Sequence, residues 1–366
     1  MSQPEARTGK QARPLRVAVL GYGLAGSAFH APLIAGLPGL ELACVVSSRP
    51  DKVRSDWPGV SVAAQPQQVF DDPSIDIVVV ATPNDTHHAL AKAALLAGKH
   101  VVVDKPCTVT LAETEDLLAT ARAQGRVLTV YQNRRFDADY LALRQVLASG
   151  QLGRVAHFES HFDRYRPQVL DRWRERNIPG SSQWLDLGSH LLDQAVQLWG
   201  CPDDISLNLA LQRDGTQVND WFHALLRYES RHPGLRVVLH AGALVASPSP
   251  RYAVHGTQGS FVKFGLDPQE DALRAGGQPH LDALGAWGQD PLPGEVLRYE
   301  NDKATRQAAP HPPGNYLAYY ANLRDHLLGR CPIEVTPPQL RQLMALLGRG
   351  EQSAREGRLV STADLQ

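Results

Sequence analysis

The strongest constraint on the fold is an alternation of short apolar runs and helical segments over the first third of the 366-residue chain. Runs dominated by Val, Ile and Leu are typical of parallel strands that are buried on both faces of a sheet. The strand candidates are LRVAVL (15–20), LELACVV (40–46), DIVVVA (76–81), HVVVD (100–104) and VLTVYQ (127–132). A helical segment over 111–124 begins with the capping box Thr110-x-x-Glu113 and ends at Gly125. This alternation predicts an α/β Rossmann domain with a doubly wound parallel sheet over 15–133.

The pattern changes after about residue 134, where runs with strand character are joined by turns instead of helices. The expected strands cover 155–162, 221–229, 235–242, 251–256 and 260–265. The expected helices cover 137–149, 184–199, 316–328 and 338–355. The Gly- and Pro-rich stretch 265–314 is expected to form long loops. We therefore predict that 134–366 forms an α+β domain with a large, mainly antiparallel open sheet, whose C-terminal helices can pack back on the Rossmann domain.

Composition argues against several classes of protein. A formal net charge of −1 gives no reason to expect nucleic acid or an anionic membrane as a partner. No apolar run approaches the roughly 18 residues of a membrane span. The polar residues 1–14 lack a secretory signal and are expected to form a flexible tail. Four widely spaced cysteines, Cys44, Cys107, Cys201 and Cys331, indicate reduced thiols in a cytoplasmic protein.

A glycine-rich loop, Gly21-x-Gly23-x-x-Gly26, directly follows the first strand. Gly21 permits a tight turn, Gly23 lets the backbone approach a pyrophosphate, and Gly26 allows the next helix to pack closely on the strand. At the first strand of an α/β domain, this motif predicts dinucleotide binding. The cofactor-binding candidates of the loop are Gly21, Tyr22, Gly23, Leu24, Ala25 and Gly26.

The end of the second strand favours NADP over NAD. NAD enzymes usually place Asp or Glu there to bind the ribose 2′-hydroxyl. In this chain Ser47, Ser48 and Arg49 occupy the position, and the nearest carboxylate, Asp51, follows a proline. Two hydroxyls and a guanidinium suit a 2′-phosphate, because Arg binds phosphate through paired hydrogen bonds. The alternative is a surface turn of ordinary polar residues, with NAD as the cofactor.

Two later strands end at the edge of the sheet where open α/β domains bind their ligands. The first of these ends continues into a helix that begins near His87, which lies either beside the cofactor or at a solvated helix N-terminus. The second ends in Asp104-Lys105-Pro106. Because Lys105 shares this edge with the nucleotide loop, we expect it to take part in the chemistry. The cofactor-binding candidates here are Ala81, Thr82, Pro83, Asn84, His87, Asp104 and Lys105.

The segment WLDLGSHLLDQ (184–194) carries a polar stripe if it is helical. Asp186, His190 and Asp193 stand at i, i+4 and i+7 and therefore share one face. Apolar residues cover the neighbouring faces. The helix alone leaves open whether this stripe is an exposed ladder or an acid–base pair directed into a site.

These motifs together resemble a known family. Gly21-Tyr22-Gly23, Asp104-Lys105-Pro106 and Asp186-x-Gly188-Ser189-His190 occur in the order and spacing of the glucose-fructose oxidoreductase / inositol dehydrogenase / rhizopine catabolism (Gfo/Idh/MocA) family. The family usually has Glu-Lys-Pro, so Asp104 is a conservative departure. Supporting stretches such as YQNRRFD, RYRPQVLDRWRE and RYAVHGTQGSFVKFG spread the resemblance over most of the chain. The similarity is greatest to the NADP-dependent scyllo-inositol dehydrogenase branch.

The resemblance implies hydride transfer between NADP(H) and a secondary alcohol of a cyclic polyol or sugar, with scyllo-inositol and inosose as the first candidates. Lys105, Asp186 and His190 would converge on one carbinol over the nicotinamide. His190 would accept the hydroxyl proton, Lys105 would stabilise the alkoxide, and Asp186 would orient a substrate hydroxyl or the imidazole. Asp193 would fix the helix or His190. Tyr316 would contact the substrate, unless it belongs to the aromatic core.

Several residues near the domain junction have both a functional and a structural interpretation. Arg172 and Trp173 would reach the cofactor or substrate by resemblance, or would be half-buried loop residues. Asn133 follows the sixth strand as a cofactor candidate. Arg134 or Arg135 would contact the cofactor or form salt bridges at the junction.

His157, Glu159 and His161 project from one face of a predicted strand. Their order is not H-E-x-x-H, and no fourth ligand is evident. We therefore expect no metal and interpret these residues as part of a sheet face or a subunit contact.

Other functions are compatible with the same fold. They are another aldose or ketose dehydrogenase of the family, a catalytically silent NADP-binding regulator, and a glycosidase that recycles a tightly held NAD. A silent regulator would not need Lys105, Asp186 and His190 together. The family often pairs second-domain sheets face to face, which implies a homodimer or homotetramer with a small-molecule substrate.

Overall fold

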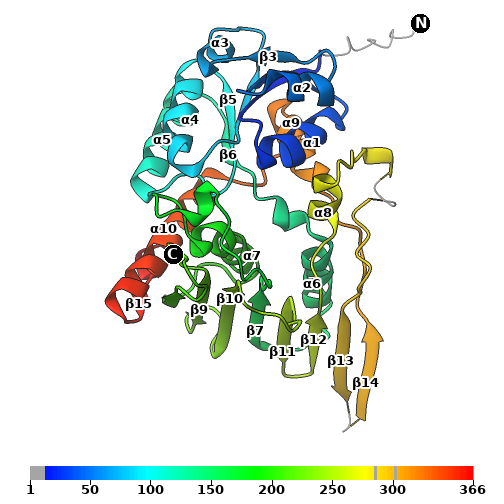
Figure 1. The fold of residues 1–366 in the computed structure, drawn as a ribbon. Coiled ribbons are helices and arrows are strands. Elements are labelled where there is room, and N and C mark those ends of the chain that lie inside the picture. Colours follow the sequence, from blue (N-terminus) through cyan, green and yellow to red (C-terminus); the bar gives the residue numbers. More distant parts are fainter. Residues whose placement is uncertain (1–12, 284–286, 301–302, 366) are drawn as a thin grey trace, which may run out of the picture.

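The first domain contains a six-stranded sheet in the order β3-β2-β1-β4-β5-β6 (Figure 1). The structure is a computed structural model and describes residues 13–283, 287–300 and 303–365. All neighbouring strands in this sheet are parallel, so the expected Rossmann sheet is confirmed. The strands are β1 (Leu15–Leu20), β2 (Leu40–Val46), β3 (Ser61–Ala63), β4 (Ile77–Val80), β5 (His100–Val103) and β6 (Leu128–Val130).

Helices cover both faces of this sheet, which explains why its central strands are continuous apolar runs. Every residue of β4 is buried, as expected for a strand with helices on either side. Helix α5 begins with the predicted capping box, in which the Thr110 side chain accepts from the Glu113 N–H, and it ends at Gly125 with φ 59°. The helices are α1 (Ala31–Ala35), α2 (Pro50–Asp56), α3 (Pro66–Phe70), α4 (His87–Leu96) and α5 (Leu111–Gln124).

The second domain contains a nine-stranded sheet in the order β14-β13-β12-β11-β7-β10-β9-β8-β15. Only β7 and β10 are parallel, so the predicted large, mainly antiparallel sheet is confirmed. The strands are β7 (Val155–His161), β8 (Asp204–Ala210), β9 (Trp221–Tyr228), β10 (Leu235–Gly242), β11 (Tyr252–Gly256), β12 (Gly259–Lys263), β13 (Glu295–Glu300), β14 (Lys303–Ala308) and β15 (Val360–Ser361).

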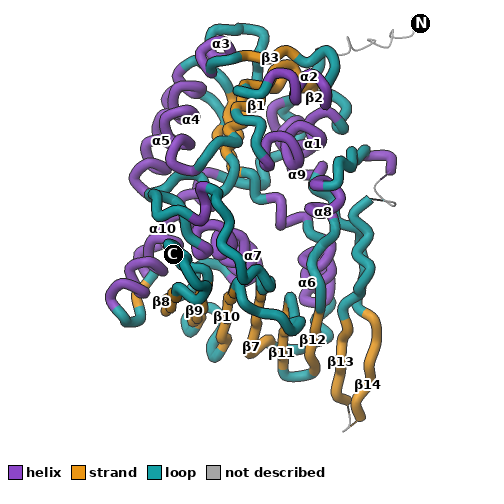
Figure 2. The backbone as a smooth tube through the Cα atoms, in the orientation of Figure 1, coloured by secondary structure: helices purple, strands orange, loops and turns teal. Residues whose placement is uncertain are grey.

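The expectation of long loops over 265–314 was wrong in part. This stretch contains β13 and β14, which extend the edge of the second sheet (Figure 2). All six residues of β14 are exposed, so the strand needs no apolar alternation and its sequence carries no burial signal. The sequence also missed β8, whose Ile205 and Leu207 are buried at the alternate spacing of a strand.

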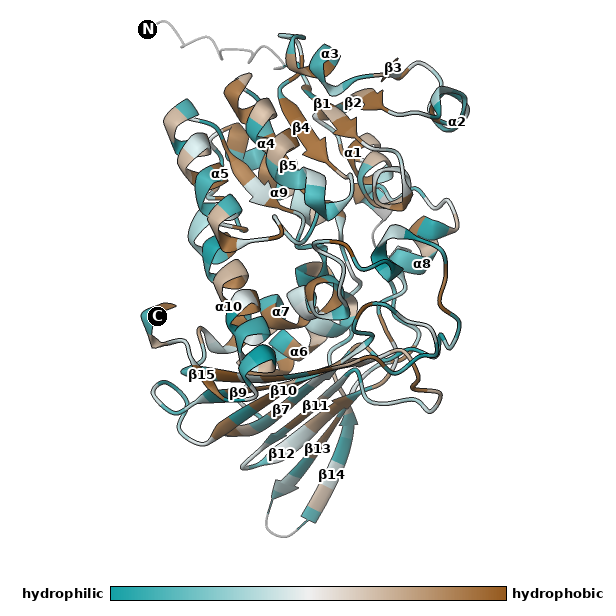
Figure 3. Cartoon of the chain, turned by 60° about the vertical axis from the view of Figure 1, so that its left-hand side comes forward, coloured by the Kyte–Doolittle hydropathy of each residue, from teal (hydrophilic) through white to brown (hydrophobic). Residues whose placement is uncertain are grey.

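Helices of the second domain pack on one side of its sheet and also reach the first domain. Figure 3 shows α6, α7 and α10 on one side of the nine-stranded sheet. Helix α9 contacts α1, while α10 contacts α5 and β8. These helices are α6 (Ala138–Ala148), α7 (Ser189–Trp199), α8 (Gln269–Arg274), α9 (Leu317–Leu327) and α10 (Pro337–Glu356). Two π-helical turns are η1 (Ala25–His30) and η5 (Trp184–Gly188), and short 3-10 turns are η2 (Asn84–Thr86), η3 (Asn133–Phe136), η4 (Trp173–Glu175), η6 (Leu281–Ala283) and η7 (Ala363–Leu365).

Most of the expected N-terminal tail, residues 1–12, lies outside the described residues. Arg13 is fixed, because its two terminal nitrogens donate to the Asp76 carboxylate at 2.7 and 2.8 Å. All four cysteines carry free thiols. None of the described helices combines the length and the apolar character that a membrane crossing requires.

Candidate active site

A cavity lies where the carboxyl ends of the first-domain strands meet the second domain. Its wall is shared by both domains, and cationic side chains are prominent in it. From the first domain it is lined by Leu24, Ala25, Phe29, Asn84, Asp104, Lys105, Tyr131 and Asn133, and at the junction by Arg134. From the second it is lined by Arg164, Arg166, Arg172, Trp173, Arg174, Glu175, Gly180, Ser182, Gln183, Asp186, Leu187, His190, Arg213, Val218, Asn219, Asp220, Gly242, Ala243, Glu270 and Arg274.

The glycine loop after β1 has the geometry that a bound dinucleotide requires. Gly21 has φ +93°, and a Cβ there would lie 2.8 Å from the Ala81 carbonyl oxygen. A Cβ on Gly26 would lie 2.0 Å from the Gly21 oxygen, so only glycine permits this packing. No atom lies within 4 Å of the Cβ position of Gly23, which leaves its backbone open to a phosphate. The three glycines thus fit a dinucleotide cofactor.

The end of β2 presents hydroxyls and a guanidinium beside this loop. Arg49 Nη2 donates to the Tyr22 carbonyl oxygen at 2.8 Å, and the Arg49 N–H donates to Ser47 Oγ at 3.0 Å. Ser48 and Arg49 are exposed. The nearest carboxylate, Asp51, accepts from Arg54 at 3.2 Å. Hydroxyls and a guanidinium are groups that can donate hydrogen bonds to a phosphate.

The end of β4 contributes one residue to the cavity wall. Asn84 lines the cavity and donates from Nδ2 to the Gly180 oxygen at 2.9 Å, which joins the two domains. His87 is buried instead of lining the cavity. Its two ring nitrogens each lie 3.0 Å from a carbonyl oxygen, those of Thr82 and Pro106. The expected position of His87 beside the cofactor is therefore corrected: it joins the turns that follow β4 and β5.

Lys105 and Asp186 form an ion pair across the cavity. Lys105 Nζ donates to Asp186 Oδ1 at 2.6 Å and to the Asp186 carbonyl oxygen at 2.7 Å. Arg174 Nε lies 3.7 Å from the same carboxylate oxygen. Burial would raise the pKa of Asp186, but Lys105 and Arg174 outweigh it and lower the pKa far below its ordinary value. Asp186 is therefore a fixed negative charge that orients the Lys105 ammonium.

The first turn of the 184–199 helix is π-helical, which the sequence did not predict. The turn η5 places the Asp186 carbonyl oxygen where Lys105 and the Ser189 hydroxyl, at 3.1 Å, both donate to it. Such turns free a carbonyl from the regular helical ladder and occur often at functional sites. A Cβ on Gly188 would lie 2.4 Å from Trp184 Cε3, so glycine is needed for the turn to pack.

His190 lines the cavity, and its Nδ1 atom forms no hydrogen bond with a described residue. Its side chain is only 5% exposed, and Nδ1 is buried. Burial lowers the pKa of His190 well below its ordinary value, and the positive charges of Lys105 and Arg134 lower it further. His190 is therefore neutral at pH 7 and able to accept a proton.

Asp193, the third member of the stripe, faces a different partner. Its two carboxylate oxygens accept from Arg135 Nε and Nη2 at 2.8 and 2.7 Å. Both side chains are almost fully buried. Asp193 thus fixes the helix through its ion pair with Arg135, and it forms no hydrogen bond with His190. Arg135 forms a salt bridge at the domain junction and does not line the cavity.

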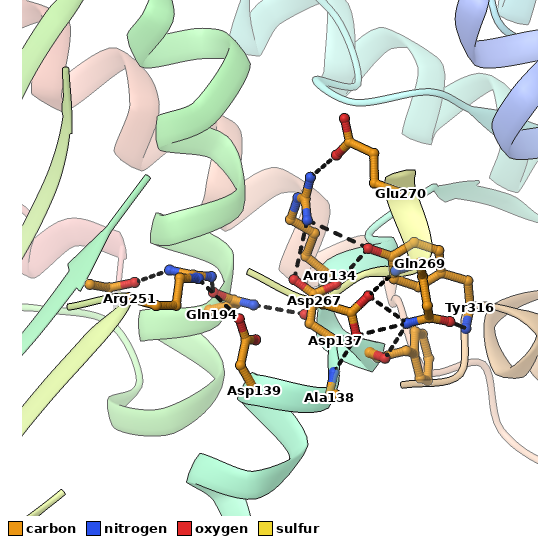
Figure 4. Close-up of polar contacts among 12 residues, drawn as sticks. Arg134, Asp137, Ala138, Asp139, Gln194, Arg251, Asp267, Gln269, Glu270 and Tyr316 are labelled. Atoms are coloured by element: carbon orange, nitrogen blue, oxygen red, sulfur yellow. Dashed lines mark hydrogen bonds and ion pairs between the residues drawn. The ribbon is translucent and has the colours of Figure 1, made fainter. Parts of the chain in front are cut away.

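Figure 4 shows a cluster of polar side chains that includes Arg134, Asp137 and Glu270. Arg134 lines the cavity and forms ion pairs with Asp137, at 3.3 Å, and with Glu270. Tyr316 is fully buried, and its hydroxyl donates to Asp137 Oδ1 at 2.6 Å. The expected substrate contact of Tyr316 is therefore corrected, because Tyr316 supports Asp137 and through it Arg134.

The loop after β7 supplies both expected and unexpected wall residues. Arg172 and Trp173 line the cavity as the sequence suggested, and Arg172 Nη2 donates to Glu175 at 2.6 Å. The sequence missed the wall residues Arg164, Arg166, Arg174, Arg213, Glu270 and Arg274. Only the alternation of Arg164 and Arg166 could have indicated two side chains on one face. Arg174 directly follows the predicted residues Arg172 and Trp173, whereas Arg213, Glu270 and Arg274 are brought in by packing over long distances along the chain.

The histidine-rich face of the second sheet lies apart from this cavity. Ligand atoms of His161, Asp163 and His240 lie within 4.8 Å of one another. His161 Nδ1 and His240 Nε2 lie 3.1 and 3.3 Å from the two oxygens of Asp163, and Ser249 also donates to that carboxylate. Hydrogen bonds within the cluster satisfy the carboxylate, and the prediction of no metal stays a prediction.

Two family models match the chain in succession. Residues 15–132 match the model described as an oxidoreductase family with an NAD-binding Rossmann fold, and residues 140–262 match the GFO/IDH/MocA C-terminal domain. The boundary between the matches falls near the junction at which Arg134 and Arg135 lie.

Similar proteins cover nearly the whole chain. The uncharacterized oxidoreductase YdgJ of Escherichia coli strain K12 is 52% identical over 93% of this chain and 96% of its own length. The scyllo-inositol 2-dehydrogenase (NADP(+)) IolW of Bacillus subtilis strain 168 is 35% identical over 94% of this chain and 95% of its own. A solved Yersinia pestis structure, assigned to the oxidoreductases, is 49% identical, has a TM-score of 0.90, and covers 96% of this chain and 97% of its own.

Proposed function

Because the chain belongs to the Gfo/Idh/MocA family of oxidoreductases, we propose that it is an NADP-dependent dehydrogenase of a cyclic polyol or sugar. The first candidate reaction is the interconversion of scyllo-inositol and inosose. One observation carries the proposal: the Lys105–Asp186 ion pair and the unpartnered His190 ring meet at one cavity beside the phosphate loop.

Distinct residues would hold the two ends of the cofactor. The backbone at Gly23 would approach the pyrophosphate, while Ser47 and Arg49 would bind the 2′-phosphate. Asn84 and Trp173 are wall residues that would flank the nicotinamide. When bound, NADP⁺ supplies the hydride acceptor.

The residues of the cavity would supply proton transfer and charge stabilisation. A neutral His190 accepts the hydroxyl proton of the alcohol as the hydride leaves its carbon. The Lys105 ammonium stabilises the developing alkoxide, since it is fixed near the reacting carbon by Asp186. In the direction of reduction the same protonated imidazole returns the proton to the alkoxide.

A screen of inositols and aldoses with NADP⁺ and NAD⁺, following the absorbance of the reduced cofactor, tests the proposal. We expect oxidation of at least one polyol or sugar, with NADP⁺ preferred roughly 10-fold or more in kcat/KM through the 2′-phosphate contact. Tight NADPH binding without any oxidation would instead favour the silent regulator. Activity without added cofactor, with nicotinamide copurifying, would favour the glycosidase.

We also propose that the protein is cytoplasmic and forms a homodimer or homotetramer through the second sheet. Support comes from its outer face, where His157, Glu159 and His161 are half-buried polar residues opposite the helices. Light scattering coupled to size-exclusion chromatography measures the oligomeric state, and a monomer at micromolar concentration would contradict the proposal.

A further inference from the structure

An extended ribbon carries two arginines into the cavity wall. Residues 163–166 continue β7 and pair with 242–245, which continue β10: the Arg164 N–H donates to the Gly242 oxygen, and the Arg166 N–H donates to the Ala243 oxygen. Alternate residues of extended backbone point to opposite sides. Arg164 and Arg166 therefore share one side of the ribbon, and both line the cavity.

These two guanidinium groups differ from the other cations of the cavity wall. Three carboxylates each hold two of those cations: Asp186 holds Lys105 and Arg174, Glu175 holds Arg172 and Arg213, and Glu270 holds Arg134 and Arg274. No carboxylate of the described residues lies within 4.0 Å of the side chain of Arg164 or Arg166. In total, eight cationic side chains and five carboxylates line the cavity. The cavity is therefore positively charged.

Of the two arginines, Arg164 has the higher free-energy cost when its guanidinium has no ion-pair partner. Its guanidinium lies 5.5 Å from the ring centre of Phe162, and burial lowers the pKa of Arg164 to about 10, although the more distant charges of Glu270 and Asp186 raise it. Removing a guanidinium from water without a counter-charge is unfavourable. A bound anion would offset that cost, because Arg forms two parallel hydrogen bonds with a carboxylate or phosphate.

The location of Arg164 indicates the substrate end of the cavity rather than the cofactor phosphates. The Phe162 ring that Arg164 contacts lies 6.4 Å from the ring of His190, measured between ring centres. The pyrophosphate and 2′-phosphate positions are at Gly23 and Arg49, both in the first domain.

We propose that Arg164 and Arg166 form an anion subsite, so that the preferred substrate is a sugar or polyol bearing a carboxylate or a phosphate ester. The inference rests on the proposed dehydrogenase function and makes its substrate class more specific. A neutral polyol would then be a weaker substrate than its acidic counterpart.

Calorimetric titration of the NADPH-loaded protein tests the subsite independently of turnover. The probes are glucuronate, glucose 6-phosphate and neutral glucose, each at low and at high salt. We expect one of the anionic sugars to bind roughly 10-fold or more tightly than glucose at low salt, and the comparison of the two separates a carboxylate site from a phosphate site. In the Arg164→Gln/Arg166→Gln variant this preference should disappear.

A control is Arg306→Gln, which removes one arginine charge from the exposed edge strand β14 and should leave the preference intact. The unliganded double variant should melt no lower than the unmodified protein, because no ion pair of Arg164 or Arg166 with a described residue is lost. Equal binding of charged and neutral sugars, or no binding of an anionic sugar up to ~10 mM, above ordinary KM values, would overturn the subsite. Weaker NADPH binding by the variant would overturn it too, by assigning these arginines to the cofactor. Failure to oxidise any alcohol would reject the dehydrogenase function, separately from the calorimetric result.

Discussion

The two walls of the cavity are built in different ways. The wall from the first domain consists mainly of residues that follow buried parallel strands, such as Leu24 after β1 and Lys105 after β5. The wall from the second domain gathers Arg164, His190 and Glu270 from segments that are far apart in the sequence. Local sequence therefore determines the first wall, whereas the pairing of distant segments determines the second.

The two walls would have different roles: the first would bind the cofactor, and the second would select the substrate. The first domain presents the backbone of its glycine loop at fixed positions, which suits the constant features of a dinucleotide. The second wall presents charged side chains whose partners are other side chains, so a single substitution there changes the charge that a substrate meets. The predictions that follow probe the junction behind the second wall, then the point where the two walls meet, and then the first domain.

The largest expected effect is on stability and concerns the buried Arg135–Asp193 pair at the domain junction, which does not line the cavity. Asp193→Asn leaves the buried Arg135 guanidinium without a counter-charge, and breaking such a pair costs about 3–5 kcal/mol. Urea unfolding measures the loss. Asp51→Asn is the control, because Asp51 is an exposed partner of Arg54 and should change stability by no more than about 0.5 kcal/mol. Equal, small losses in both variants would show that the buried pair does not stabilise the domain junction.

The next effect concerns the point where the walls meet. Lys105→Met and His190→Ala should each lower turnover by roughly 10²-fold or more, equivalent to about 2.7 kcal/mol, while NADPH binding measured by fluorescence changes little. The double variant should lose less than the product of the two, since both groups serve one proton transfer. Near-normal turnover of the His190 variant would make the 184–194 stripe a structural feature only.

A smaller effect is expected at the first wall. Arg49→Ala should weaken NADPH binding by about 1.5–3 kcal/mol and leave NADH binding nearly unchanged, because only NADPH carries the 2′-phosphate. Arg54→Ala is the control and should affect neither cofactor, because Arg54 lies in helix α2, which follows Arg49, and pairs with Asp51. Equal weakening of both cofactors by the Arg49 substitution would identify the end of β2 as an ordinary turn.

The smallest effect is on the pH profile, which reports the charges that surround His190. Burial, Lys105 and Arg134 lower its pKa, while Asp186 opposes them, so the proton-accepting neutral form persists well below pH 6.5. The oxidation rate should therefore fall less than about two-fold between pH 8 and pH 6.5, the fall that an ordinary histidine would produce. In Lys105→Met the acid limb should move to higher pH, because a neighbouring positive charge is removed. An acid limb near pH 6.5 in the unmodified protein would contradict this electrostatic account.

The sequence predicted what depends on short-range patterns. Buried strands such as β4 appear as apolar runs, and the glycine spacing locates the phosphate loop, so the first domain and Lys105 could be identified directly. The helical pattern alone does not assign a role to Asp186 and His190, and only the family resemblance predicts that they lie opposite Lys105. The exposed strand β14 could not be predicted, because no side of it is buried and its sequence has no alternation.

The remaining site residues depend on contacts that a sequence does not display. An aromatic residue in a helix has the same sequence spacing whether it packs in a core or contacts a ligand. Tyr316 is fully buried, and its hydroxyl contacts Asp137. Arg164 lies in the cavity only because the ribbon 163–166 pairs with 242–245. The π-helical form of η5 depends on tight packing of Gly188 against Trp184, which spacing alone does not reveal.

The ribbon 163–166 also has a consequence for how such a protein can diversify. Asp163 points to the histidine-rich outer face of the sheet, where it accepts from His161, while Arg164 lines the cavity. Adjacent residues therefore affect separate properties of the protein. A substitution at position 164 or 166 alters which ligands bind in the cavity, and a substitution at position 163 alters the outer surface of the sheet. Selection can retune ligand preference along this ribbon while the opposite surface is inherited unchanged.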